Sequence, residues 1–157
     1  MIEEIKIAPV RLTASIQFEK SEEARRYAEL NRQATQAKSR SYAEAVALLQ
    51  KAKAIKGDLY DDVRLAKLMQ QAGQFDEAIR EIKWLVSRAA YQIDKNSAHL
   101  SKQERAYFLA VHLEKIYEAA ALICRRAGDG KKQQTFEQMR AATADRAGRL
   151  EPAWKSS

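Results

Sequence analysis

The sequence predicts an all-α fold, and three observations predict it. Only 5 of the 157 residues are glycine and only 2 are proline, whereas sheets with many tight turns use both. Alanine, leucine, glutamate, lysine, arginine and glutamine dominate, and these are good helix formers. Apolar residues recur at spacings of three and four, as at Phe75, Ala78, Ile79, Ile82, Leu85, Val86, Ala89 and Ile93. About six helices are predicted in a single domain, residues 18–150.

Residues 1–17 are the one stretch with strand character. Ile5 and Ile7 alternate with Lys6 and Ala8, and Pro9 would restrict a strand to a sheet edge. Because no second strand is predicted, we expect a short extended N-terminal arm. Packing of the arm on the helices is favoured over exchange between chains or a peptide-like tail.

The first predicted hairpin covers residues 21–57. Ser21, followed by two glutamates, is a typical helix start. Ser41 lies three residues before Glu44 in a capping-box pattern and begins the second helix. Gly57 is expected to end that helix.

Two further hairpins are predicted, at residues 58–95 and 101–147. In the second hairpin, Asp58 is expected to cap a helix that ends at Gly73, and the next helix begins near Phe75. In the third, Ser101 and Glu104 form a capping box for a long helix, which the "GDG" of 128–130 ends. Residues 151–157 are expected to be a C-terminal tail.

The first two hairpins repeat. Aligning residues 41–55 with 74–88 places Ala45 on Ala78 and Tyr42 on Phe75, a period of 33 residues, the difference between 78 and 45. A period of this length is typical of stacked helical hairpins.

The elbow "GQFDEA" resembles that of the tetratricopeptide repeat (TPR) family. The family's positions are filled in order by Leu65-Ala66, Met69, Gly73, Phe75, Asp76-Glu77-Ala78, Ile82 and Leu85. The resemblance covers residues 59–90 and, with Arg40 in place of the elbow glycine, residues 26–57. It implies a TPR-like superhelix of helical hairpins, with the third hairpin as a divergent cap. The alternative is an irregular helical bundle in which this elbow is incidental.

The resemblance also implies a concave groove lined by the first helix of each hairpin. The first two hairpins would contribute Tyr27, Asn31, Ala34, Lys38, Tyr60, Val63, Arg64, Lys67 and Gln71. If the third hairpin stacks in phase, Glu118, Leu122, Arg125 and Arg126 join them. The basic members would favour an acidic peptide or a C-terminal carboxylate, since they donate charge-assisted hydrogen bonds. The alternative is that they are ordinary solvated side chains.

Two aromatic residues lie off the main apolar stripe of the helix that begins near Phe75. Trp84 and Tyr91 stand near Arg80 and Arg88, and an exposed tryptophan beside arginine is typical of an interface anchor. The alternative for Trp84 is packing beneath the following helix.

The sequence predicts no enzyme, no cofactor and no metal site. His112 and Cys124 are separated by roughly 18 Å along one predicted helix, and the acid pairs fall in first helical turns, where they complement the helix dipole. No apolar run is long enough to span a membrane, and the N-terminus lacks the apolar core of a signal peptide. With a single cysteine, these features favour a cytoplasmic protein.

The functional prediction is a non-enzymatic protein-interaction adaptor or chaperone-like module, with a homodimer as a further expectation. The net charge of +7 is concentrated towards both ends and leaves two alternatives open. One is a nucleic-acid-binding accessory protein with phosphate contacts from Arg125, Arg126, Lys131, Lys132, Arg140 and Arg146. The other is an inhibitor or immunity-type protein that blocks another protein.

Overall fold

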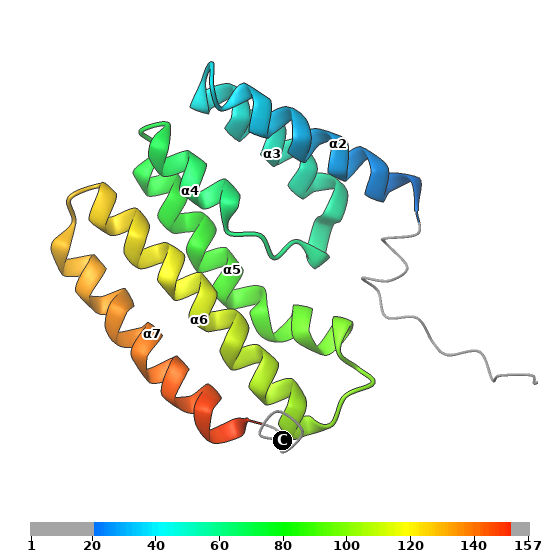
Figure 1. The fold of residues 1–157 in the computed structure, drawn as a ribbon, viewed down its shortest axis with the longest axis vertical. Helices are drawn as coiled ribbons and strands as arrows, with labels where there is room; N and C mark the ends of the chain where they lie inside the picture. The colour runs from blue at the N-terminus through cyan, green and yellow to red at the C-terminus, as the bar shows by residue number, and fades with distance from the viewer. Residues whose placement is uncertain (1–20, 152–157) are drawn as a thin grey trace, which may run out of the picture.

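The computed structural model describes residues 21–151, which form six α-helices (Figure 1). These are α2 (Glu22–Ala37), α3 (Tyr42–Lys56), α4 (Arg64–Gln71), α5 (Phe75–Asn96), α6 (Lys102–Arg126) and α7 (Gly130–Leu150), with a 3₁₀ turn, η1 (Gly57–Leu59), after α3. No strand occurs between residues 21 and 151, so the predicted all-α class is confirmed for this range. The expected arm, 1–17, and the tail beyond Glu151 lie outside the described residues.

Consecutive helices pair into three hairpins: α2 with α3, α4 with α5, and α6 with α7. The hairpins follow one another in chain order, because α3 packs on α4 and α5 packs on α6 (Figure 1). The first helices of the second and third hairpins, α4 and α6, also touch. This last contact brings α4 and α6 to a common face.

The predicted serine caps are present at three helix starts. The hydroxyl oxygen of Ser21 accepts a hydrogen bond from the Ala24 amide, and that of Ser41 accepts one from Glu44. Ser101 and Glu104 form the full reciprocal capping box at the start of α6. Each cap supplies an acceptor for an amide that has no partner within its helix.

Two elbows share one backbone geometry. Gly73 and Gly128 have φ of 81° and 76°, in the left-handed region that favours glycine. After each glycine the next amide donates to a carbonyl five residues back, Gln74 to Met69 at 2.8 Å and Asp129 to Cys124 at 2.9 Å. The third hairpin therefore turns as the second does, although the sequence around Gly128 lacks the Asp-Glu-Ala pattern.

The core runs through all three hairpins. Ala45 and Ala78, the aligned alanines, are fully buried, as close helix crossing requires. The largest fully buried apolar side chains belong to α4, α5 and α6 and are Leu65, Ile82, Leu85, Ile116 and Ile123. By contrast, Ala147 is the single buried residue of α7, which covers the outer side of α6.

The predicted start of the first helix of the second hairpin is wrong. We expected Asp58 to cap it, but Asp58 lies in η1 and α4 begins at Arg64. Tyr60 is extended and only 2% exposed, and the Gln92 side chain donates to the carbonyls of Asp58 and Tyr60. These long-range contacts hold the connection out of the helix, and the Asp62 carboxylate accepts from the Arg64 amide at 2.8 Å instead.

Candidate functional site: a basic groove across the hairpins

A cavity of about 380 Å³ opens between α2, α4 and α6. Its lining residues are Ala34, Thr35, Lys38, Leu49, Arg64, Lys67, Leu68, Gln71, Leu122 and Arg126. Several of them are groove positions that the family resemblance implied, and the structure brings together residues from all three hairpins. The position of Arg126 depends on α6 stacking beside α4, which the sequence alone left open.

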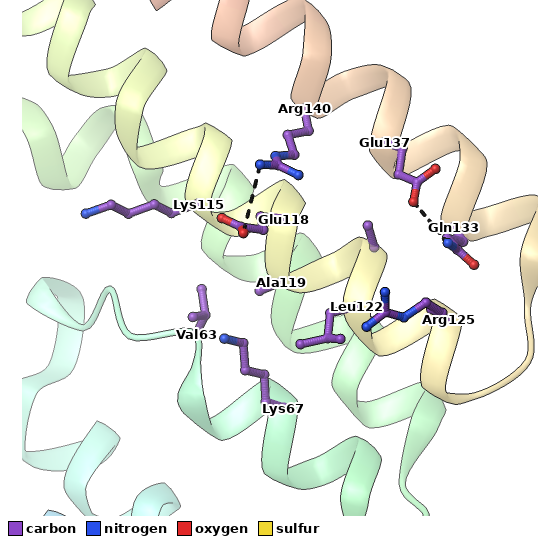
Figure 2. A pocket seen from close by; sticks show the side chains of 11 residues that line it. Val63, Lys67, Lys115, Glu118, Ala119, Leu122, Arg125, Gln133, Glu137 and Arg140 are labelled. Atoms are coloured by element: carbon purple, nitrogen blue, oxygen red, sulfur yellow. Dashed lines mark hydrogen bonds and ion pairs between the residues drawn. The ribbon is translucent and has the colours of Figure 1, made fainter.

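A second cavity of about 410 Å³ continues from the first, and Lys67 and Leu122 line both (Figure 2). Its other lining residues are Val63, Lys115, Glu118, Ala119, Ala121, Arg125, Gln133, Glu137 and Arg140. We call the two cavities together the basic groove. The groove thus reaches from α2, across α4 and α6, to α7.

The basic groove carries a strong excess of positive charge. Its basic residues are Lys38, Arg64, Lys67, Lys115, Arg125, Arg126 and Arg140. Only two carboxylates line it, those of Glu118 and Glu137. Because hollowed surfaces lined by one sign of charge concentrate the field, the groove attracts anionic groups.

Most of this positive charge is not neutralised locally. Lys38, Lys67, Arg125 and Arg126 form no ion pair with an acidic residue within 21–151. Arg140 lies 3.9 Å from Glu118 across the α6–α7 hairpin, as Figure 2 shows. The four unpaired cations are therefore available to an external anion.

Arg64 is held in place by two partners. Its guanidinium donates to Asn31 Oδ1 at 2.9 Å and pairs with Asp62 at 3.3 Å. Asn31 in turn donates to the Tyr27 carbonyl at 3.0 Å. Asn31 and Arg64 are 33 residues apart, one repeat period, so this bond joins equivalent positions of neighbouring hairpins.

The floor between the basic side chains is apolar. Leu49 and Leu68 are 3% and 4% exposed, whereas Leu122 is partly exposed at the junction of the two cavities. Figure 2 shows Leu122 facing Val63 and Lys67 of the α4 segment. A ligand with both acidic and apolar side chains would match this surface.

Three predicted groove residues line neither cavity: Asn31, which holds Arg64, and two tyrosines. Tyr60 is buried beside Trp84, with ring centroids 6.3 Å apart, and offers nothing to the groove. Tyr27 lies beneath Lys56, whose ammonium is 5.1 Å from its ring. The place of Tyr60 follows from the short α4, because the segment before Arg64 is an extended connection that carries Tyr60 into the core.

The two predicted interface anchors differ in their exposure. Trp84 is partly buried, and its nearest cation is Lys53 of α3, 4.0 Å from the ring centroid, which also pairs with Glu81 at 2.6 Å. The ring of Trp84 thus lies beside Lys53 of the preceding hairpin and Tyr60 of the connection before α4. Tyr91 is 40% exposed, with Arg88 at 4.9 Å from its ring.

The six predicted phosphate contacts separate into three places. Arg125, Arg126 and Arg140 line the basic groove. Lys132 lies at the elbow, 5.3 Å from the Phe75 ring and 3.9 Å from Asp129. Lys131 and Arg146 are exposed on α7.

Sequence reasoning missed Lys115 in the groove. Lys115, Glu118, Leu122 and Arg125 follow one another at spacings of three and four on α6. That spacing places them on one helix face and could have identified Lys115.

The titratable side chains of the described range bear on metal binding and thiol chemistry. No group of three His, Cys, Asp or Glu side chains in this range could hold a metal ion. Cys124 is fully buried, and burial raises the pKa of its thiol, which disfavours the reactive thiolate. Across 21–151, no helix has the length and apolarity needed to cross a membrane.

Comparison with known proteins gives no match to a protein-family model, a curated protein or a solved structure. The functional argument therefore depends on the chemistry of the basic groove.

Proposed function

We propose that this chain is a non-enzymatic, TPR-like adaptor that binds an acidic segment of another protein in the basic groove. The observation that carries the proposal is the set of unpaired cations around an apolar floor. Seven basic residues and two acidic ones line the two joined cavities. The three stacked hairpins and the 33-residue link between Asn31 and Arg64 support the TPR-like part of the proposal.

The chemistry favours a peptide with carboxylates on both sides of an apolar residue. Lys67 stands beside Leu122 in both cavities, with Arg126 in one and Arg125 in the other. An apolar side chain placed on Leu122 would bring flanking carboxylates to these cations. Charge-assisted hydrogen bonds from arginine and lysine are about twice as strong as neutral ones.

The direct test is fluorescence anisotropy with a labelled peptide of glutamates flanking a leucine. The variant Lys67→Glu/Arg126→Glu reverses two groove charges, and Lys51→Glu/Lys83→Glu makes the same net change at exposed positions outside the groove. We expect the groove variant to weaken binding about tenfold or more, roughly 1.4 kcal/mol, and the control to bind like wild type. Equal loss in both variants would show that only net charge matters, and would contradict the proposal.

A second candidate is favoured by Arg125, Arg126 and Arg140, which line the same groove and could contact phosphates. A labelled single-stranded oligonucleotide in the same assay separates the two. Tight oligonucleotide binding that falls steeply with salt, together with no binding of the acidic peptide, would replace the adaptor proposal by nucleic-acid binding.

A further inference from the structure

A smaller cavity of about 210 Å³ lies apart from the apolar floor of the basic groove. It is formed by the connection before α4, the C-terminal end of α5 and the N-terminal half of α6. The residues that matter are Asp61, Gln92, Asn96, Phe108, His112 and Lys115. We call it the polar cavity.

Three buried polar atoms without a hydrogen-bond partner belong to side chains that line this cavity. They are Gln92 Oε1, Asn96 Oδ1 and His112 Nε2, half of the six such atoms found in the described part of the chain. Buried polar groups are almost always hydrogen-bonded, so a cluster of unsatisfied atoms indicates a missing partner. The partner must be polar and must fit the cavity.

Gln92 fixes what kind of partner is missing. It is only 1% exposed, and its Nε2 already donates to the carbonyls of Asp58 and Tyr60. The orientation of the amide is thereby set, and Oε1 is left as an acceptor. The missing partner must offer a donor to it.

The surroundings add further negative character. α5 ends at Asn96, so the unsatisfied carbonyls of its last turn carry the negative end of the helix dipole. Asp61 brings a carboxylate, 3.6 Å from Lys56. Burial lowers the pKa of His112, so its ring is neutral near pH 7 and does not repel a cation. These features favour a positively charged donor, such as a primary ammonium group.

The outer side of the cavity has the opposite charge. Lys115 is exposed, and Figure 2 shows its side chain directed away from Glu118 and Arg140. It has no ion pair within 21–151. Ile93, Phe108 and Val111 supply apolar wall to the same cavity.

We infer that the polar cavity binds a small zwitterion, a free α-amino acid with an apolar side chain. Its ammonium group donates to Gln92 Oε1, Asn96 Oδ1 and the Asp61 carboxylate, and its carboxylate meets Lys115. Its side chain packs against Phe108. The cavity is large enough, since an engineered apolar cavity of about 150 Å³ holds benzene. This site does not depend on the proposed function of the basic groove.

The test is an NMR titration of the full chain in which the ring signals of His112 are followed. Three matched probes are used: leucine, 3-methylbutylamine, which lacks the carboxylate, and 4-methylpentanoate, which lacks the amine. We expect saturable shifts of His112, with leucine binding about tenfold more tightly than either fragment. The ring of His99, exposed in the turn between α5 and α6, is the internal control and should not shift in a saturable way.

Two variants assign the ends of the ligand. Asn96→Ala should weaken the binding of leucine and of 3-methylbutylamine alike. Lys115→Gln should weaken the binding of leucine but leave the binding of 3-methylbutylamine unchanged. The control Lys102→Gln, at an exposed position at the start of the same helix, should bind both like wild type. These substitutions avoid Gln92, whose loss could unfold the connection before α4.

Two results would overturn the inference. If none of the three probes shifts His112 in a saturable way in the folded protein, the cavity holds water only. If leucine and the amine bind equally well, the carboxylate makes no contact and the ligand is not a zwitterion. Lys115 lines both the polar cavity and the basic groove, but neither result bears on the acidic peptide, whose test substitutes Lys67 and Arg126 instead.

Discussion

At the scale of single residues, Gln92 determines where a helix begins. Its amide donates to two carbonyls of the connection between η1 and α4, and one of these belongs to the buried Tyr60. Asp58 is further tied to Arg88 of α5 by an ion pair. Together these contacts replace the first turns that a longer α4 would have had.

Substitution of Gln92 by leucine should therefore destabilise the fold. Gln92→Leu keeps a similar volume but leaves the Tyr60 carbonyl buried without a donor, which costs about 1–3 kcal/mol. Urea denaturation would measure the loss, with Gln50→Leu, an exposed glutamine of α3, as the matched control. An unchanged midpoint for Gln92→Leu would show that these hydrogen bonds do not hold the connection.

His112 gives a pH dependence of defined sign. Burial lowers its pKa below the ordinary value of 6.5, Asp61 opposes this shift and Lys115 adds to it. The unfolded chain then binds more protons than the folded one as the pH falls through and below this value. Stability is unaffected by His112 above the ordinary pKa and decreases below it.

We therefore expect the free energy of unfolding to decrease when the pH is lowered from about 7 to about 5.5. This decrease should be smaller in His112→Gln than in wild type, because the variant lacks the titrating ring. Urea denaturation at both pH values measures this decrease for each protein. Because each protein is compared with itself at two pH values, any pH-independent effect of the substitution on stability cancels. His99→Gln retains His112 and serves as the control. The same pH dependence in all three proteins would contradict the assigned role.

At the scale of elements, helix caps could be predicted from the sequence, whereas contacts between distant segments could not. Ser21, Ser41 and Ser101 cap helices as expected because a cap involves amides only three residues away. Asp58 failed as a cap because Gln92, 34 residues away, holds its carbonyl. The contact between Trp84 and Lys53 likewise joins two hairpins, so no local pattern indicates it.

The candidate sites divide along the same line. The resemblance to the TPR family implied groove positions for Lys38, Arg64, Lys67 and Gln71, and these four residues line one cavity. The polar cavity could not be predicted, since three segments build it and one of them is the irregular connection before α4.

The backbone geometry of Gly128, at the elbow between α6 and α7, predicts the effect of substituting it. Gly128 has φ of +76°, where a residue with a Cβ is strained, although nothing lies within 4 Å of the added atom. Gly128→Ala should therefore cost about 1 kcal/mol through the backbone alone. Gly130→Ala, at the first residue of α7, has open space and no such φ, so it should be neutral or stabilising. Thermal denaturation distinguishes the two, and equal effects would argue against the shared elbow geometry.

At the scale of the whole molecule, the three hairpins should differ in local stability. Each hairpin contacts only its neighbours, as in other stacked repeat structures. The middle helices α5 and α6 hold many buried residues, whereas α2 buries Ala34 and Ala37 and α7 buries only Ala147. Amide hydrogen exchange should accordingly be slowest in α5 and α6 and faster in α2 and α7.

The basic groove connects these two outer helices, which gives a test of how a ligand would use it. Lys38 follows α2 and Arg140 belongs to α7, and the groove between them crosses α4 and α6. An acidic peptide long enough to reach both should slow exchange in α2 and α7 together, because it adds contacts to the ends that open most easily. A shorter peptide centred on Leu122 should protect α4 and α6 and leave the outer helices unchanged. If the long peptide protects only one outer helix, the two cavities act as separate sites and the continuous groove is not the binding surface.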